Sequence, residues 1–557
     1  ATYGTILLRR RRELHRRVTE AFEELYASRI EASAPLLAHH AREGGDDDRT
    51  LRYASLAAEA DARLYANAET VTHTTWAIEA AMRLGTTRIA PLYTRRGRAL
   101  ELSGRSVDAV TNYEEMEKAA QASGDRTAAL AANLALTTLY ATPTPVFDAV
   151  AGRALCERTI ALARELGDRA AEAKALWNLM TLNVFSGGEP KEAVRAGEES
   201  LAIARELGAG EQIAFTLNDL WRPYAAAGDL EAARAALEEA RPLWKELENV
   251  PMYCENLSST GGLLALAGDN AGSLALTDES HRIAADIGNR WGQSYSLLNS
   301  YHIDASQGNV GRALAKMRGC IECAEASGFM IPLAATRADM GALYADLGDV
   351  ERGAALAEAG LAVAAEVNAL AIPLVMASVA EVHLLAGRLE DAEAAIERSM
   401  SDRLPGLLAF SSAANARIQK GRLAAIRGDH AHAIEIADAV IAWLRPLAVR
   451  PFDPAALLLK GTSLAALGES DEALGVLHEG RHEAERLGFA PIGWQIDMAM
   501  SRLAAAAGDS ARAGEARERA RRNVDRVAGT IDDGELRATF LRLPAVRAVT
   551  DEGTLAP

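Results

Sequence analysis

The amino-acid sequence predicts an all-α solenoid built from antiparallel helical hairpins. Three observations predict this class: a turn glycine that recurs about every 40 residues, a second turn between successive glycines, and small residues at fixed distances from each glycine. Because each repeat packs mainly on its neighbours, a chain of 557 residues needs no division into globular domains of ordinary size. The composition agrees, since 49% hydrophobic residues with only 5% aromatic residues suits helices that pack through small side chains.

The first observation is a ladder of glycines, each placed between two helical segments. Successive glycines are separated by 40, 40, 40, 39, 41, 40 and 40 residues. They are Gly228, Gly268, Gly308, Gly348, Gly387, Gly428, Gly468 and Gly508, and Gly188 and Gly104 continue the ladder toward the N-terminus with one rung lacking its glycine. A fixed period of this length indicates a repeat architecture.

The second observation is a set of looser turns between the rungs of the ladder. They contain Gly85, Gly124, Gly167, Gly208, Asn249, Gly288, Gly328, Asn368 and Gly488. Two turn sites per period indicate two helices of about 15 residues in each repeat, joined antiparallel by short connections. Prolines weaken the rhythm at residues 142–145 and 446–454.

The third observation concerns two rows of small residues. Five residues after the turn glycine all ten repeats have a small residue: Ala109, Ala193, Ala233, Ser273, Ala313, Gly353, Ala392, Ala433, Ala473 and Ala513. Seven residues before the glycine eight of ten residues are small, and the exceptions are Trp221 and Tyr301. Small residues on facing helices let two backbones approach closely, so these rows predict where the two helices of a hairpin cross.

These features resemble the tetratricopeptide repeat family, whose signature is a small residue midway along the first helix, a Gly-Asp-type turn and an alanine five residues later. Gly228, Asp229 and Ala233 match that signature, and the register holds from about residue 91 to residue 522. The resemblance implies a right-handed superhelix of about twelve hairpins whose first helices line a concave groove. The repeat of about 40 residues exceeds the family's usual length of about 34, and resembles the helical arms of large bacterial signalling ATPases.

Both ends of the chain add to this resemblance. Residues 11–18, 37–40 and 65–69 resemble the junction at which a repeat arm follows the NTPase module of STAND-type signalling ATPases, many of which carry a class III adenylate or guanylate cyclase domain and others a DNA-binding domain. Residues 536–546 resemble the natural end of such chains. We therefore expect three parts: an N-terminal helical region that joins an upstream module (1–84), the repeat array (85–525) and a C-terminal capping segment (526–557).

Charge and cysteine usage limit the partners and the compartment. A net charge of −17 argues against a nucleic-acid partner, and the basic residues between Arg9 and Arg17 are best interpreted as a solvated or docking helix face. Four irregularly spaced cysteines do not suggest a disulfide framework, so we expect a cytoplasmic protein. Residues 361–382 are apolar but contain Glu366, Pro373 and Glu381, which predicts two packed helices and no membrane span.

Motifs that usually carry chemistry fall on ordinary positions of the repeat. His478, Glu479 and His482 spell HExxH, a zinc-hydrolase pattern, but His478 belongs to a row that is polar and solvent-facing in other repeats. Cys320 and Cys323 form a CxxC within a helix, and Cys320 belongs to a small, packed row. His39-His40 and His430/His432 lack cysteine or carboxylate partners at metal-site spacing. We expect no catalytic residue, no cofactor and no metal.

The better functional signal is an aromatic and polar stretch between about residues 174 and 307, on helices that the resemblance places along the groove. The candidate residues are Asn178, Phe185, Asn218, Trp221, Arg222, Glu255, Tyr295, Tyr301 and His302. Later repeats have mostly alanine and leucine at these places. We expect the groove to bind a protein or peptide. The alternatives are a small-molecule sensor that uses the same groove, packing aromatics without a ligand and, more remotely, a zinc hydrolase.

Overall fold

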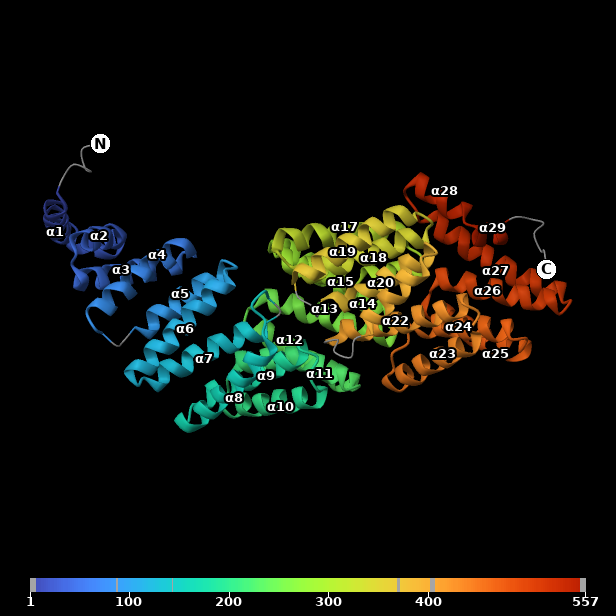
Figure 1. Cartoon of the computed structure of the whole chain (residues 1–557), viewed down its shortest axis with the longest axis horizontal. Helices are drawn as coiled ribbons and strands as arrows, with labels where there is room; N and C mark the ends of the chain where they lie inside the picture. Colours follow the sequence, from blue (N-terminus) through green and yellow to red (C-terminus); the bar gives the residue numbers. More distant parts are fainter. Residues whose placement is uncertain (1–6, 87–88, 143, 368–370, 401–405, 551–557) are drawn as a thin grey trace. The chain divides into compact units, whose positions relative to one another are not determined.

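A computed structural model describes residues 7–86, 89–142, 144–367, 371–400 and 406–550 of the chain. Within these residues every regular element is a helix and no β-strand occurs, which confirms the all-α class (Figure 1). The chain separates into two compact units. The first contains residues 1–182 and 202–207, and the second contains residues 183–201 and 208–557.

The helices follow the predicted alternation. Those of the first unit are α1 (Leu8–Leu25), the short η2 (Ala27–Arg29), α2 (Ile30–Gly44), α3 (Asp47–Arg63), α4 (Asn67–Arg83), α5 (Ala90–Leu102), α6 (Ser106–Ser123), α7 (Arg126–Ala141) and α8 (Ala149–Leu166). The boundary between the units passes through α9 (Arg169–Phe185) and α10 (Pro190–Glu206).

The second unit continues the same hairpins to the end of the described chain. Its helices are α11 (Gly210–Ala226), α12 (Leu230–Glu246), α13 (Val250–Ala267), α14 (Asn270–Asp286), α15 (Arg290–Leu298), α16 (Tyr301–Gln307), α17 (Val310–Ser327), α18 (Met330–Asp346), α19 (Val350–Val367), α20 (Ile372–Leu385), α21 (Leu389–Ser399), α22 (Gly406–Ile426), α23 (His430–Leu444), η3 (Arg445–Leu447), α24 (Asp453–Ala466), α25 (Ser470–Leu487), α26 (Ala490–Ala506), α27 (Ser510–Gly529), α28 (Gly534–Arg542) and α29 (Pro544–Thr550). None of the described helices combines the length and the apolarity that a bilayer span requires.

The recurring turn combines a helix stop and a helix start on adjacent residues. Gly228 follows α11 with φ +87°, a left-handed conformation that glycine adopts without a Cβ clash. Asp229 then caps α12, because its carboxylate accepts the Ala232 backbone N–H at 2.9 Å. The same pair of signals recurs at Gly268-Asp269, Gly428-Asp429 and Gly508-Asp509. The Gly-Asp ladder therefore marks the points at which one helix ends and the next begins.

The rows of small residues lie where the two helices of a hairpin cross. Gly341 of α18 faces Gly353 of α19 so closely that a Cβ atom built on Gly341 would lie 2.5 Å from the Gly353 carbonyl oxygen. The equivalent Ala233 and Ala313 are completely buried. Backbone atoms cannot move aside as a flexible side chain can, so overpacking keeps these positions small.

In the second unit the first helix of each hairpin packs against the first helix of the next. Such contacts join α13 to α15, α15 to α18, α18 to α20, α20 to α22 and α22 to α24, and α11 also contacts α22. The second helices, such as α12, α14 and α19, contact chiefly first helices. The first helices therefore form a continuous row from repeat to repeat through this unit.

One first helix departs from the expected single rod. α15 ends at Leu298 and α16 begins at Tyr301, with Ser300 between them at φ −130°. Tyr301 stands in the row that is small in most repeats and is buried, with 2% of its surface exposed. The break thus lies directly beside one of the two large residues of this row, whereas α11, which holds the other, Trp221, is unbroken.

Late helices of the second unit pack on early turns. A Cβ atom on Gly228, Gly268 or Gly308 would lie 2.6, 2.8 or 2.7 Å from the side chain of Leu447, Leu487 or Val527, and each of these pairs is 219 residues apart in sequence. Hydrogen bonds join the same segments, since Thr530 Oγ1 donates to the Gly308 carbonyl at 2.6 Å and Gly311 N–H donates to the Thr530 carbonyl at 2.9 Å. The repeats of this unit thus pack on one another over a long sequence distance as well as on their neighbours.

Candidate functional site

The candidate site is one face of the first helices in the second unit, which we name the inner face. It consists of the residues 13, 9, 6 and 2 positions before the turn glycine on helices α11 to α22. Steps of four, three and four residues keep these positions on one side of a helix. Its polar members are Asp219, Arg222, Glu255, Ser259, Tyr295, Asn299, His302, Ser306, Asp339, Asp346, Ser378, Glu381, Asn415, Gln419 and Arg422.

Arg222 starts a series of side-chain bonds between successive first helices. Its guanidinium donates to Asp219 Oδ1 at 2.5 Å within α11 and to Glu255 Oε1 of α13 at 3.3 Å. The side chains of Arg222 and Glu255 retain 18% and 12% of their surface, so solvent still reaches them. Burial opposes the charge of Arg222, but the carboxylates of Asp219 and Glu255 outweigh it and raise the pKa of Arg222. Burial also raises the pKa of Glu255, against the pull of Arg222.

The next bonds connect α13 to α15 and α16 to α18. The Ser259 hydroxyl lies 3.1 Å from the Tyr295 hydroxyl, and Tyr301 Oη donates to Asp339 Oδ2 at 2.8 Å. Burial raises the pKa of Asp339, while the bonds from Tyr301 and Ser378 stabilise its charged form.

The series continues to α20 and α22. Ser378 Oγ donates to Asp339 Oδ1 at 2.6 Å, and Arg422 donates to Glu381 Oε1 at 2.8 Å. Asp346, at the end of α18, has an exposed surface. Desolvation by the surrounding protein and, second, repulsion by the Glu381 carboxylate raise its pKa to about 8, while Arg422 acts in the opposite direction. We name these bonds, from Arg222–Glu255 to Glu381–Arg422, the inner-face ladder.

Aromatic rings stand beside this ladder. Trp291 stacks on Tyr295 with ring centroids 5.2 Å apart and on Phe329 with centroids 4.9 Å apart. Trp291, Tyr295 and Phe329 are half-buried, so the stack keeps an accessible edge. His302 is exposed on α16, and desolvation by the surrounding helices lowers its pKa, which favours the neutral imidazole.

The nine residues expected from the sequence have different environments. Arg222, Glu255, Tyr295 and His302 lie on the inner face and keep accessible surface. Trp221 and Tyr301 are 3% and 2% exposed and belong to packed cores. Phe185 is half-buried at the end of α9.

The two expected asparagines are buried completely. In the first unit Asn178 Nδ2 donates to Thr137 Oγ1 at 2.8 Å and so bridges α9 to α7. In the second unit Asn218 Oδ1 accepts from Trp244 Nε1 and from Asn256 Nδ2, each at 3.2 Å. Both asparagines therefore satisfy buried polar groups between helices.

The polar inner face extends beyond the stretch that the sequence singled out. Ala335 and Ala342 are buried, but Asp339, Asp346 and Glu381 continue the polar row past residue 307. The sequence contains a signal for this row at one position of the repeat. The residue nine positions before the turn glycine is polar in six successive repeats: Asp219, Ser259, Asn299, Asp339, Ser378 and Gln419.

The motifs with possible chemistry form no reactive group. His482 of α25 is exposed and lies 3.6 Å from Glu483, whereas Glu479 pairs with Arg445 at 2.6 Å. Within the described part of the chain, the side chains of His478 and His482 do not form a group of three close metal ligands with Glu479 or with any other histidine, cysteine or carboxylate. Cys320 and Cys323 are buried, and burial raises the pKa of Cys320 to about 11, so its thiolate is scarce at neutral pH.

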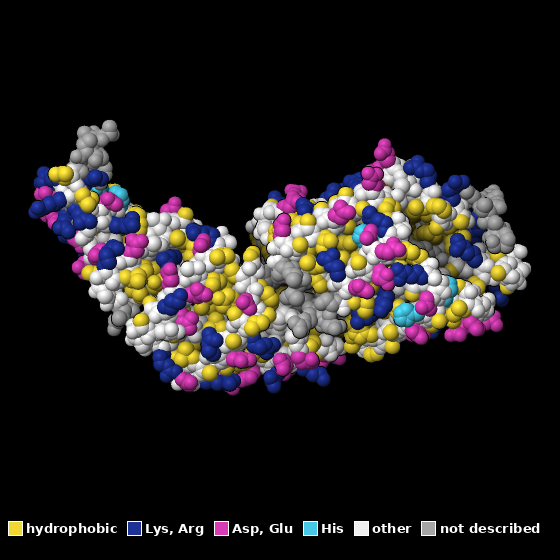
Figure 2. Space-filling model, viewed as in Figure 1, with side chains coloured by type: hydrophobic (Ala, Val, Ile, Leu, Met, Phe, Trp, Pro, Cys, Tyr) yellow, Lys and Arg dark blue, Asp and Glu magenta, His cyan; other side chains and the backbone are white. Residues whose placement is uncertain are grey.

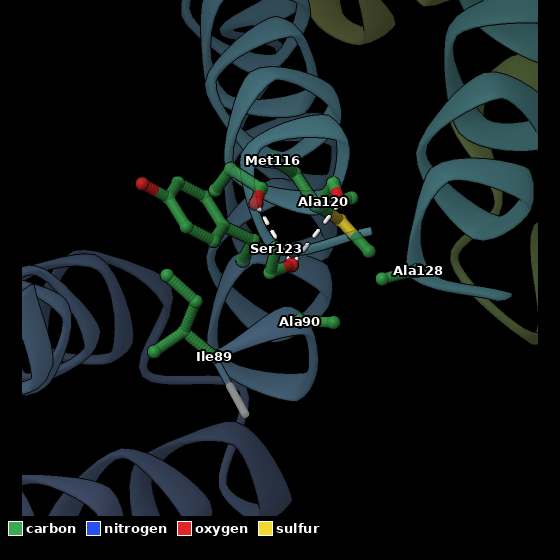
Figure 3. Close-up of a pocket in the computed structure, with 8 residues that line it drawn as sticks. Ile89, Ala90, Met116, Ala120, Ser123 and Ala128 are labelled. Carbon is green, nitrogen blue, oxygen red and sulfur yellow. Dashed lines mark hydrogen bonds between the residues drawn. The ribbon is translucent and has the colours of Figure 1, made fainter. Parts of the chain in front are cut away.

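A small cavity in the first unit offers no room for a metabolite. Ile89, Tyr93, Met116 and Ala128, among others, line it. Figure 3 shows Ile89, Met116 and Ala128 around Ser123, whose hydroxyl donates to the Ala119 and Ala120 carbonyls. Its volume of about 10 Å³ corresponds to one water molecule at most.

Comparisons with known proteins support the fold. No protein-family model and no curated protein sequence matches the chain. In structure the chain is similar to the crystal structure of the APC/C hetero-tetramer Cut9-Hcn1, with a TM-score of 0.50, 12% identity and 96% of each chain covered. It also matches BtubC (BKLC) from P. vanneervenii over 44% of this chain and 92% of that one, at 18% identity and a TM-score of 0.31, which is too low to support an argument. The chain is thus an all-α solenoid of tetratricopeptide-like hairpins.

Proposed function

We propose that this chain is a non-catalytic binding scaffold and that an extended segment of a protein partner lies along the inner face of its second unit. The inner-face ladder carries this proposal. Helix crossings elsewhere in the unit bury alanine and glycine, whereas the inner face keeps partly accessible donors and acceptors from α11 to α22. A peptide offers backbone and side-chain groups that can join such a row.

The charge of the inner face favours a basic segment. Its named residues include the carboxyl groups of Asp219, Glu255, Asp339, Asp346 and Glu381 and the guanidinium groups of Arg222 and Arg422. Burial disfavours the charge of three of these carboxyl groups, as the raised pKa values of Glu255, Asp339 and Asp346 indicate, and neighbouring carboxylates add to this effect. A lysine or arginine of the partner would stabilise the charged forms through charge-assisted hydrogen bonds.

The aromatic stack suits the rest of such a segment. Trp291, Tyr295 and Phe329 form one half-buried stack, and the Tyr295 member of it interacts with Glu255. The aliphatic stem of a lysine or arginine can pack on these rings while its charged end reaches a carboxylate. A small-molecule sensor would use the same residues, and the experiment below distinguishes it.

We further propose that the scaffold serves as the regulatory arm of a larger signal-transduction ATPase or nucleotide cyclase. The support is the resemblance of residues 11–18, 37–40 and 65–69 to the junction behind an NTPase module. Partner binding would then shift the balance between two states of that module. The coding sequence upstream of Ala1 tests this relation: a phosphate-binding loop is expected there, and an unrelated module would contradict it.

Fluorescence anisotropy with short labelled peptides tests the binding site. We expect a lysine- and arginine-rich peptide to bind, and its glutamate-substituted counterpart not to bind. The double variant Glu255→Gln/Asp339→Asn should weaken binding by roughly tenfold or more, since each lost charge-assisted bond removes at least about 1.5 kcal/mol.

The control is Glu238→Gln/Glu397→Gln, which changes two exposed carboxylates on the second helices α12 and α21. It should leave the affinity for the basic peptide unchanged. Equal binding by both double variants, or equal binding of basic and acidic peptides, would refute the assignment. A thermal-shift screen in which metabolites and no peptides stabilise the chain would favour the small-molecule alternative.

A further inference from the structure

Three histidines from two helices meet in the first unit. His15 comes from α1, and the neighbours His39 and His40 come from α2. One ring nitrogen of each lies within 4.8 Å of the other two, and Nδ1 of His15 is 2.7 Å from Nδ1 of His40. Within the described residues this is the one group of three potential metal ligands gathered so closely.

The cluster is open to solvent on one side. His15 is buried with 8% of its surface exposed, His40 is half-buried and His39 is exposed. Figure 2 shows histidine side chains at the surface next to the basic side chains of the α1 region. An ion can therefore reach the group from solvent, while α1 and α2 hold its inner side.

Neutral imidazole is the form that binds a metal ion. Two nearby arginines are engaged elsewhere: Arg16 Nε donates to the Gly44 carbonyl at 2.9 Å, and Arg42 lies over the Trp76 ring.

A carboxylate follows the two histidines on α2. Glu43 follows His39 by four residues and His40 by three, which places it one helical turn along the same side of α2. It is exposed, and its charge acts on both His15 and His40. A tetrahedral zinc site takes four such nitrogen and oxygen ligands with metal–ligand distances of about 2.0–2.2 Å.

We propose that His15, His39 and His40 bind one divalent ion of the zinc class, with Glu43 or water as the fourth ligand, and that the ion fastens α1 to α2. Imidazole suits zinc, copper and nickel, so these ions are the chemistry to test. Tetrahedral zinc brings its ligand nitrogens to roughly 3.3 Å from one another. One ring nitrogen from each of the three histidines lies within 4.8 Å of the other two, and these nitrogens reach that spacing if the exposed His39 side chain turns inward. The contact of His15 with His40 then opens slightly to admit the ion.

The test is direct metal binding to the full chain without an affinity tag. After dialysis against Zn²⁺ and removal of free ion, we expect one equivalent of zinc by elemental analysis. Substituted Co²⁺ should give the intense visible bands of a tetrahedral site. His39→Gln should lower the affinity for Zn²⁺ by at least about tenfold, because removal of a ligand exceeds the effect of losing an outer hydrogen-bond partner.

Two further variants separate coordination from folding. His39 is exposed, so His39→Gln should leave the circular dichroism spectrum unchanged even if the buried His15→Gln variant unfolds. His73→Gln is the matched control, since His73 is a histidine of the same unit that pairs with Asp61 at 2.6 Å outside the cluster. Zinc below one equivalent in the parent chain, or equal zinc binding by His39→Gln and His73→Gln, would overturn the proposal. Amide exchange in α1 should slow on zinc addition in the parent chain and not in His39→Gln.

Discussion

At the scale of single residues, neighbours decide whether the polar groups of the inner face carry charge. Asp346 has an exposed surface but lies among protein and near Glu381, so its pKa rises to about 8. His302 is exposed as well, and desolvation lowers its pKa. Both groups are thus mainly uncharged near neutral pH. The inner face therefore has less charge than its residue types suggest. A charged ligand that binds there can change which of these groups are ionised.

The raised pKa of Asp346 predicts a pH-dependent stability. The folded chain keeps a proton on Asp346 up to about pH 8, whereas an unfolded aspartate loses it near its ordinary pKa of 3.8. The folded state loses stability relative to the unfolded state as pH rises between these values. The Asp346→Asn variant does not undergo this loss of stability. The difference between its melting temperature and that of the parent chain should therefore increase from pH 4 to pH 8.

Melting curves in a series of buffers measure this gain. In the Glu381→Gln background, which removes the neighbouring carboxylate, the pH dependence of the gain should be smaller. A gain that is constant with pH would show that Asp346 titrates at its ordinary value.

At the scale of elements, the hairpin is defined by how closely its two helices cross. Gly341 of α18 lies against backbone atoms of α19, with the Gly353 carbonyl 2.5 Å and the Ala357 nitrogen 2.9 Å from the place where a Cβ atom would be. Gly475 of α25 is also inside a helix, but nothing lies within 4 Å of its Cβ position. The two glycines share helical geometry and differ in packing.

Alanine at these two positions should change stability in opposite directions. Gly341→Ala should lower the free energy of unfolding by about 1–3 kcal/mol through overpacking against backbone. Gly475→Ala should raise it by about 0.5–1 kcal/mol, because alanine loses less conformational freedom in a helix than glycine does. Chemical denaturation of both variants gives the comparison. If both variants are stabilised, the close crossing of α18 and α19 is wrong.

At the scale of the molecule, the second unit is held by contacts that are remote in sequence. One buried cluster combines Leu297 and Tyr301 of the middle repeats with Val524 and Phe540 of the last helices. Asn270 Nδ2 donates to the Leu487 carbonyl at 3.0 Å across 217 residues. In a simple repeat array each unit touches only its neighbours, so these contacts add cooperativity that the repeats alone would lack.

Substitutions at two turn glycines distinguish the effect of these remote contacts from the effect of strain in the turn itself. Gly308 and Gly428 have φ values of +80° and +83°, so alanine is strained in either place. Beside the Cβ position of Gly308 stand Val527 at 2.7 Å and Pro491 at 3.4 Å, whereas nothing lies within 4 Å of that of Gly428. Gly308→Ala should therefore cost about 1–3 kcal/mol more than Gly428→Ala.

Amide exchange locates the difference between these two variants. In Gly308→Ala the amides of α27 should exchange faster, although α27 begins about 200 residues later in the sequence. In Gly428→Ala the loss of protection should stay within α22 and α23. Equal costs and local effects for both variants would mean that the late helices do not pack on the early turns.

Much of the fold was predictable because its signals are local. Gly228 and Asp229 act within one turn, and Ala233 acts within one hairpin, so their spacing predicts where helices end and where they cross. The break of the helix before Tyr301 was not predicted, since a large residue at this position does not by itself break the helix, as Trp221 in the unbroken α11 shows.

The candidate site was predicted in part for the same reason. The repeat register places Arg222 and Glu255 on first helices, but it does not separate Arg222 from the buried Trp221 one position away or from the buried Asn218 four positions away on the same helix. The rotation of each helix about its own axis decides which of these side chains keep solvent access. That rotation is set by packing between repeats and not by spacing within one repeat.

The sequence by itself determined the class, the period and the hairpins, because turn glycines, caps and small crossing residues act over fewer than about 20 residues. Only the tertiary structure decided the rest. It brings His15 next to His39 and His40, links Asp339 of α18 to Ser378 of α20, and places Val527 on the turn at Gly308. Each of these contacts joins segments whose approach depends on how hairpins pack on one another, and no local pattern in the sequence records that packing.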